Sequence, residues 1–126
     1  MNDFIKIILT RDSVCAGDDF DGLHKKTLNL YPDESVNKLI DKIFEIKYLP
    51  TISGGKATWV VKTNAINIAV LAEQWNQVKY FIDDKLTLDK IGLIDNKLNI
   101  NIEYYSQIDP EYIYKEISKG NNPNKW

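Results

Sequence analysis

The sequence predicts an α+β fold in which one main helix packs against a mixed sheet. Val36, Leu39, Ile40 and Ile43 follow the i, i+3, i+4, i+7 spacing of an amphipathic helix. Several other segments alternate between apolar and polar residues, as half-buried strands do. The 126 residues suffice for one hydrophobic core and are too few for two ordinary domains, so we expect a single domain over residues 1–126.

The chain is expected to begin with a hairpin that has a long connection. Residues 4–10 are almost all apolar or β-branched, which indicates a strand near the centre of the sheet. Residues 27–31 alternate strictly, and this places Leu28 and Leu30 inward. Pro32 then ends the second strand.

The main helix is expected over about residues 35–47. The first N–H groups of a helix lack partners within it, and the side chain of Ser35 or Asp33 can cap one of them. Pro50 and the pair Gly54-Gly55 predict the end of the helix and a turn.

The second half of the chain predicts strands, a helical turn and a last helix. From Ala57 onward the apolar residues recur with a period of two. Asp109 followed by Pro110 favours a helix start, because Asp caps the first turn and Pro fits its first position. The expected elements are a hairpin at about 57–72, strands at 78–82 and 98–104, a turn at 83–85, a helical turn at 86–91, a helix at about 110–118 and a flexible tail at 119–126.

Composition and charge exclude several classes of function. Charged residues make up 27% and apolar residues 44% of the chain, and no stretch approaches the ~20 apolar residues of a membrane span. Sixteen Lys and Arg against eighteen Asp and Glu give a net charge of -2, and Arg11 is the only arginine, which disfavours direct nucleic-acid binding. The first residues lack the pattern of a signal peptide, so we expect a cytoplasmic protein. A single cysteine, Cys15, agrees with a reducing compartment.

Two stretches resemble parts of ubiquitin-like β-grasp domains. "LNLYPDESVNKLIDKI" is similar to their second strand and helix, and "LTLDKIGLIDNKLNINIEYY" to their short helical turn and last strand. The resemblance implies that the first and last strands run parallel, side by side, in the centre of the sheet. The hairpin at 57–72 then looks like an insertion after the helix. Ubiquitin-like modifiers need an exposed terminal Gly-Gly, whereas this chain ends in Asn124-Lys125-Trp126, so modifier chemistry is not expected.

The stretch "SVCAGDDFDGLH", residues 13–24, holds the only cysteine and the only histidine. Cys15, His24 and Asp21 could form a nucleophile, its base and a supporting acid. Their spacing across a loop does not place them together, and a lone cysteine near a strand end is more often a buried apolar residue. We therefore expect no catalytic site.

A metal site in the same stretch is not expected either. Asp19 and Asp21 fit the third and fifth positions of an EF-hand loop, but Gly17 and Leu28 stand where its first and last ligands are needed. Zinc would need three or four Cys or His ligands. At most a weakly held cation on Asp18, Asp19 and Asp21 remains, and no cofactor is expected.

Acidic loops and aromatic residues favour protein binding instead. The candidate partner-binding residues are Asp18, Asp19, Asp21, Asp83, Asp84, Trp75 and Tyr105. Complementary charge speeds encounter and sets specificity, and aromatic residues are frequent anchors of interfaces. The alternative for each acid is ordinary turn chemistry, for which Asp is well suited. Trp59 and Tyr80 are expected in the core, and of the adjacent Tyr104 and Tyr105 at least one lies outside the main core or under the final helix.

A small, acidic, single-domain chain is similar in general character to the bacterial immunity proteins that are encoded with polymorphic or contact-dependent toxins. This resemblance implies a protein partner, such as a basic nuclease-type toxin domain, whose active site is covered. The alternative is a ubiquitin-like adaptor or a subunit of a larger complex, and an enzyme built on Cys15 and His24 is the third possibility. A homodimer through an exposed strand edge is also compatible with the sequence.

Overall fold

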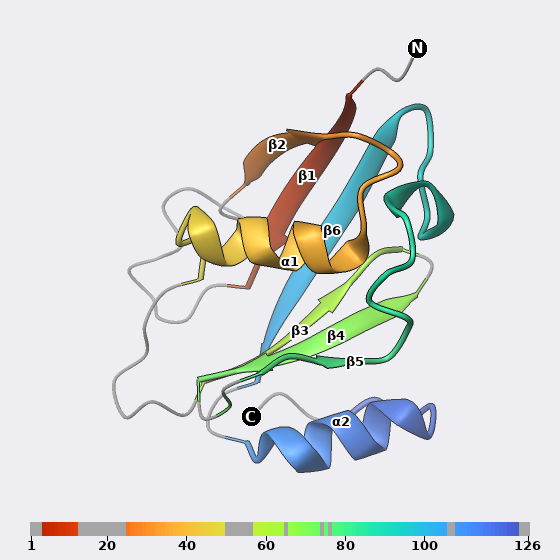
Figure 1. The fold of residues 1–126 in the computed structure, drawn as a ribbon. Coiled ribbons are helices and arrows are strands. Elements are labelled where there is room, and N and C mark those ends of the chain that lie inside the picture. Colours follow the sequence, from red (N-terminus) through yellow and green to blue (C-terminus); the bar gives the residue numbers. More distant parts are fainter. Residues whose placement is uncertain are drawn as a thin grey trace.

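The computed structural model describes residues 4–12, 25–49, 57–64, 66–73, 75, 77–105 and 108–123. Within these residues, the strands form one mixed sheet in the order β2-β1-β6-β3-β4-β5, and two α-helices accompany it (Figure 1). The predicted α+β fold with a main helix and a C-terminal helix is therefore confirmed. The elements are β1 Ile5–Arg11, β2 Lys26–Leu30, α1 Val36–Glu45, β3 Thr58–Lys62, β4 Asn67–Ala72, β5 Lys79–Tyr80, a 3₁₀ turn Leu88–Lys90, β6 Lys97–Tyr105 and α2 Pro110–Ser118.

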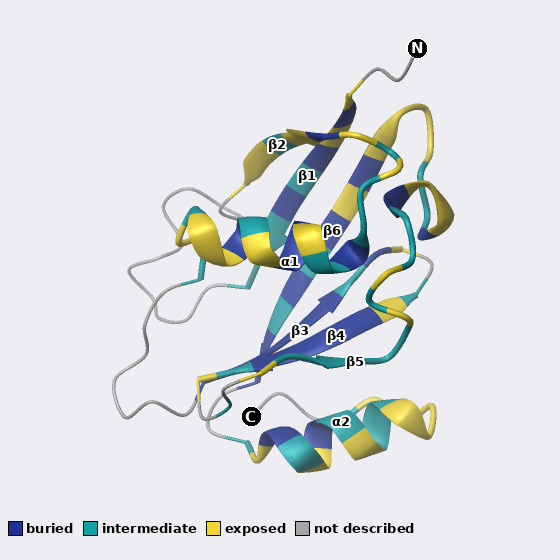
Figure 2. Ribbon diagram, in the orientation of Figure 1, coloured by how far each residue is buried: buried dark blue, intermediate teal, exposed yellow. Residues whose placement is uncertain are grey.

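Strands β1 and β6 run parallel in the middle of the sheet. Ile7 pairs with Leu98 and Leu9 with Ile100, and all four side chains are buried. Because side chains alternate between the two faces of a strand, this register gives one face a continuous apolar row, and Figure 2 shows the alternation along both strands. The parallel central pair expected for the first and last strands is confirmed.

Strands β3 and β4 form the predicted hairpin, which is an integral part of the sheet. β3 pairs antiparallel with β6 as well as with β4. The hairpin expected as an insertion after the helix thus lies within the sheet, and its first strand is bonded directly to β6 of the central pair. β5 is shorter than the predicted strand at 78–82, since the chain leaves the sheet edge there to reach the start of α1.

Helix α1 packs its apolar stripe against one face of the sheet, as predicted. Its buried residues are Val36, Leu39, Ile40 and Ile43. They belong to one core cluster with the apolar rows of β1, β6 and β3, including Trp59, which is 2% exposed. The expectation that Trp59 fills the core is thus confirmed.

Helix α1 ends at Glu45, earlier than expected. Lys47 adopts a left-handed conformation, with φ of 55°. Its N–H donates to the carbonyl of Phe44 at 3.0 Å, and the N–H of Tyr48 donates to the carbonyl of Ile43 at 3.3 Å. These two bonds form a Schellman motif, which satisfies the last carbonyls of the helix. The proline and glycines expected to end the helix lie outside the described residues, and this ending does not need them.

Helix α2 packs over β3 and β4 on the opposite face of the sheet (Figure 1). Val60, Val70, Tyr105 and Ile113 form a second apolar cluster under it. Val60 faces α2 because its neighbours in β3 face α1, and side chains alternate along a strand. In the described part of the chain, neither helix is long and apolar enough to cross a membrane.

Both ends of α2 are capped. The Asp109 carboxylate accepts a hydrogen bond from the N–H of Glu111 at 3.1 Å, as the Asp-Pro pair predicted. At the other end, Gly120 has φ of 88°, and its N–H and that of Asn121 each donate at 2.9 Å to carbonyls of the last turn. Residues 119–121 therefore form the capped end of α2, within the segment 119–126 that we expected to be a flexible tail.

Candidate functional site

Asp83, one of the predicted partner-binding residues, lies in the turn that follows β5. Its carbonyl accepts a hydrogen bond from the N–H of Leu86 at 3.0 Å, and its Oδ1 accepts one from the N–H of Lys85 at 3.0 Å. These are the turn contacts for which Asp is suited. The Asp83 side chain remains exposed, so the carboxylate both holds the turn and faces solvent.

Asp84 is tied to the first turn of α1. Its carbonyl accepts from the N–H of Asn37 at 2.9 Å, and its Oδ2 accepts from the Asn37 amide at 3.2 Å. The carbonyl of Leu86 accepts from the N–H of Val36 at 2.8 Å. Backbone carbonyls from a distant turn thus satisfy the free N–H groups of the helix. The predicted side-chain cap is wrong, because the hydroxyl of Ser35 donates to Asn37 Oδ1 at 2.5 Å instead.

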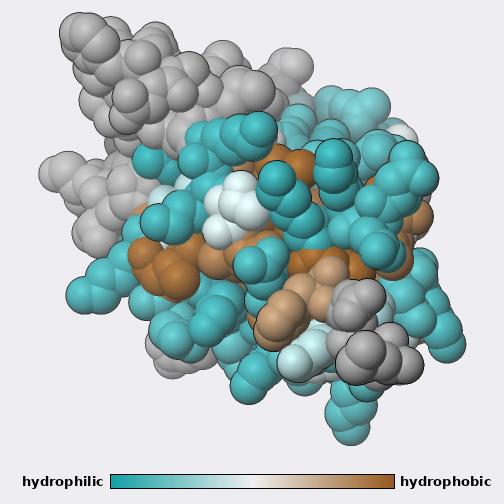
Figure 3. All heavy atoms as spheres, turned by 90° about the horizontal axis from the view of Figure 1, so that it is seen from above, coloured by the Kyte–Doolittle hydropathy of each residue, from teal (hydrophilic) through white to brown (hydrophobic). Residues whose placement is uncertain are grey.

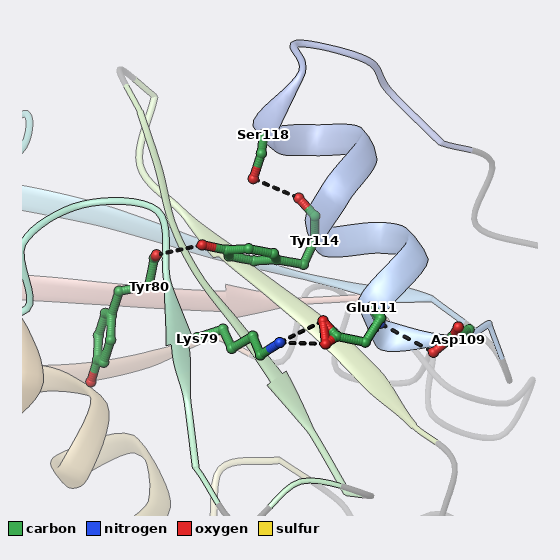
Figure 4. Close-up of polar contacts among 6 residues, drawn as sticks. All are labelled: Lys79, Tyr80, Asp109, Glu111, Tyr114 and Ser118. Atoms are coloured by element: carbon green, nitrogen blue, oxygen red, sulfur yellow. Dashed lines mark hydrogen bonds and ion pairs between the residues drawn. The ribbon is translucent and has the colours of Figure 1, made fainter.

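A third carboxylate, Asp41 of α1, lies on the same side of the molecule. Burial, followed by the negative charges of Asp84 and then Asp41, raises the pKa of Tyr80 to about 12. Both carboxylates must lie close to the Tyr80 phenol to act on it in this way. Figure 4 shows the Tyr80 ring pointing away from α2, and the ring packs against the main core, as predicted. We call Asp41, Asp83 and Asp84 the acidic surface.

The acidic surface combines exposure with a fixed backbone. Asp41 and Asp83 are exposed, whereas Asp84 is partly buried. Within the described residues, none of the three forms an ion pair, so their charge is available to a partner. The buried stripe of α1 positions Asp41, and the turn bonds position Asp83. Groups held in this way lose little further conformational freedom on binding.

Sequence reasoning missed Asp41. A charged residue on the polar side of an amphipathic helix is typical of any solvated helix. Its position on that side could be predicted from the spacing of Leu39, Ile40 and Ile43. Its proximity to Asp84 could not, because it depends on where the turn after β5 meets α1.

Trp75 lies on the α2 side of the sheet, apart from the acidic surface. It is partly buried and packs against the cluster under α2. Lys79 Nζ lies 4.9 Å from the centre of the Trp75 ring and 5.5 Å from that of Tyr114, and it forms an ion pair with the Glu111 carboxylate (Figure 4). The Tyr114 hydroxyl donates to the carbonyl of Tyr80 at 3.3 Å. These contacts fasten α2 to β5, and Trp75 takes part in them.

Tyr105 is not a surface residue. Its side chain is only 4% exposed and lies in the cluster under α2. Burial, followed by the charges of Glu103 and Asp12, raises the pKa of Tyr105 to about 12. We therefore remove Tyr105 from the candidate interface. The alternative that one of the two adjacent tyrosines lies under the final helix is correct, since Tyr104 belongs to the main core.

The remaining predicted residues, Asp18, Asp19 and Asp21, lie outside the described residues, as do Cys15 and His24. Their proposed roles stay predictions. In the part of the chain that the structure describes, no three His, Cys, Asp or Glu side chains are grouped so that they could hold a metal ion.

Two apolar features were not among the predicted residues. The rings of Phe4 and Tyr31 stack with centres 4.3 Å apart, although they are 54% and 40% exposed. Phe4 directly precedes β1 and Tyr31 directly follows β2. Seen from above, the surface of the molecule shows hydrophobic residues gathered between hydrophilic ones (Figure 3). A cleft of about 370 Å³ beside α2 is lined in part by Phe81, Ile82 and Tyr114.

Comparison of the sequence with the models of known protein families gives no match, and comparison with curated protein sequences gives none.

Proposed function

We propose that the protein is a non-enzymatic module that binds another protein through the acidic surface. Its most concrete role is that of a bacterial immunity protein, which neutralises a cognate toxin domain by covering the toxin's active site. The observation that carries the proposal is the pair of exposed carboxylates, Asp41 and Asp83, which come from different elements and are held by the α1 stripe and by the turn.

The expected fit is electrostatic. A nuclease-type active site binds phosphate groups and therefore carries lysine or arginine side chains. Carboxylates on the immunity protein would occupy the place of those phosphates. Opposite charges would speed the encounter and disfavour partners that lack a basic cleft. In this role the protein would act in the cytoplasm of the cell that makes the toxin.

The test is a binding and protection assay with the product of the neighbouring gene. We expect a complex with nanomolar affinity and protection of cells that express the toxin. The variant Asp41→Asn/Asp83→Asn should weaken the complex, mainly by slowing association, because it removes charge without removing volume. Glu116→Gln is the control for a negative charge lost elsewhere, since Glu116 lies on α2 on the other side of the sheet, where it pairs with Lys119 at 3.7 Å.

Two results would count against the proposal. One is the absence of both complex and protection. The other is a Glu116→Gln variant that weakens binding as much as the change at Asp41 and Asp83 does. The segment 13–24 is tested separately with Asn at Asp18, Asp19 and Asp21, which we propose add to the same interface.

The second candidate function is a ubiquitin-like adaptor or a subunit of a larger complex. The parallel central pair β1 and β6, crossed by α1, supports it because the β-grasp resemblance implies that arrangement. The neighbouring genes distinguish the two functions: a toxin gene favours the immunity protein, whereas a secretion or metabolic operon favours the adaptor. A homodimer through a strand edge, which stays a prediction, would use β2 or β5, the edges of the sheet.

A further inference from the structure

Within the described residues, no helix or loop covers one part of the sheet face that carries α2. Strands β2, β1 and β6 lie side by side, so residues that are paired across them form rows over this face. The first row is Asn29, Lys6 and Lys97, and the second is Thr27, Ile8 and Asn99. Further along the strands, Val60 of β3 and Tyr105 of β6 face the same side and lie in the cluster under α2. In the described residues, nothing packs over the first two rows, which we call the open rows.

The open rows are basic and polar, in contrast to the net charge of -2 for the whole chain. Lys6, Lys97, Asn29, Thr27 and Asn99 are exposed, and Ile8 is partly buried between them. No carboxylate belongs to either row. Further along β6 on this face, Glu103 is paired with Lys62 at 3.3 Å.

Lys6 and Lys97 stand directly opposite one another in neighbouring strands. Like charges at directly opposed positions repel and destabilise a sheet. Within the described residues, neither lysine has a carboxylate partner. A negatively charged group placed between the two ammonium groups would remove this repulsion, and the Asn29 amide beside them can donate a hydrogen bond to it.

We propose that the open rows form a second interface, distinct from the acidic surface, which binds an acidic surface of another protein. A carboxylate of that partner would lie against Lys6 and Lys97, while an apolar side chain would cover Ile8. Protein interfaces combine an apolar centre with a polar rim, and the row of Thr27, Ile8 and Asn99 has that composition.

A protein partner fits these rows better than a nucleic acid does. Nucleic-acid surfaces commonly use arginine for phosphates and exposed aromatic rings for stacking. The open rows hold neither. The overall negative charge of the chain would also repel a polyanion at long range.

The test is an NMR titration of the isotope-labelled full chain with an acidic peptide, Glu-Glu-Leu-Glu-Glu. Amide signals of β1, β2 and the first half of β6 should shift. The variant Lys6→Gln/Lys97→Gln should bind the peptide at least tenfold more weakly. The matched control Lys115→Gln/Lys119→Gln, which also removes two lysines but on and after α2, should bind it with unchanged affinity. The acidic-surface variant Asp41→Asn/Asp83→Asn should not lower the affinity for the peptide, so the two interfaces are tested independently.

A second variant separates binding from folding. Lys97→Glu replaces the repulsion with an attraction to Lys6, so the free protein should unfold at a higher urea concentration while its binding of the peptide is lost. The proposal is overturned by the absence of shifts at millimolar peptide, by shifts confined to α1 and residues 83–86, or by equal binding of the Lys97→Glu variant. Tighter binding of a single-stranded oligonucleotide of the same charge would overturn it in favour of a nucleic-acid surface.

Discussion

Replacing Lys47 with glycine should stabilise the protein. Lys47 follows α1 in the left-handed conformation, with φ of 55°. The equivalent position after α2 holds Gly120, with φ of 88°. Both helices therefore end in the same motif, one with the residue that suits it and one without.

The magnitude follows from two opposing terms. The left-handed conformation costs a residue with a Cβ roughly 1–2 kcal/mol. Glycine avoids that cost, but it makes the unfolded chain more flexible. This flexibility favours the unfolded state and offsets about 0.5–1 kcal/mol of the gain. The exposed Lys47 side chain forms no ion pair within the described residues, so no contact of that kind is lost. The net gain is about 0.5–1 kcal/mol, or about 2–4 °C in Tm.

The assay is urea denaturation followed by circular dichroism, with the midpoint compared at constant slope. Lys47→Ala is the matched control and should change little, because alanine carries the same Cβ. Gly120→Ala should be destabilising by about 1 kcal/mol, and the cost would be purely conformational because a Cβ at Gly120 meets no atom within 4 Å. If Lys47→Gly proved no more stable than Lys47→Ala, the attribution to backbone conformation would be refuted.

Three further outcomes follow from the contacts described. Ile43→Ala should cost about 2–5 kcal/mol in urea denaturation, because it opens a cavity where α1 meets the sheet; a loss under 1 kcal/mol would mean that the side chain is not packed. Asp109→Ala should lower stability by about 1 kcal/mol through the lost cap, whereas Asp109→Asn should keep most of it. Burial raises the pKa values of Tyr48, Tyr80 and Tyr105 from 10.0 to about 12. The unfolded chain therefore releases these phenol protons near pH 10, whereas the folded protein keeps them until about pH 12. Their contribution to the free energy of unfolding is complete below pH 10 and is lost as the pH rises towards 12. An absorbance titration of tyrosinate formation that shows all tyrosines ionising near pH 10 in the folded protein would contradict this.

The two proposed interfaces carry opposite charges on different sides of the molecule. The acidic surface lies beside α1, whereas the lysines of the open rows lie on the other face of the sheet. A net charge of -2 hides this separation, because the sum over the chain says nothing about where the charges lie. Two partners of opposite charge could therefore bind without competing.

Much of the fold could be predicted from the sequence because its causes are local. The helical spacing from Val36 to Ile43 fixes which side of α1 is buried, and the alternation from Leu98 to Tyr104 fixes the inward face of β6. The cap of α2 by Asp109 is local as well, since the carboxylate and the N–H that it accepts from are two residues apart. The candidate site was predicted less well, because Asp83 and Asp84 were identified as acids in a turn, while Asp41 was missed.

The sequence by itself therefore determined the helices and strands and their apolar faces, because these depend on the spacing of apolar residues along a short segment. Only the tertiary structure decided what those elements meet. The carbonyls of Asp84 and Leu86 reach the start of α1 and make a side-chain cap unnecessary. Tyr105 is buried because α2 folds back over the sheet, although its sequence position next to Tyr104 allows either exposure or burial. Lys6 and Lys97 become neighbours only when the first and last strands pair, since register between distant strands is set by the packing of the whole core.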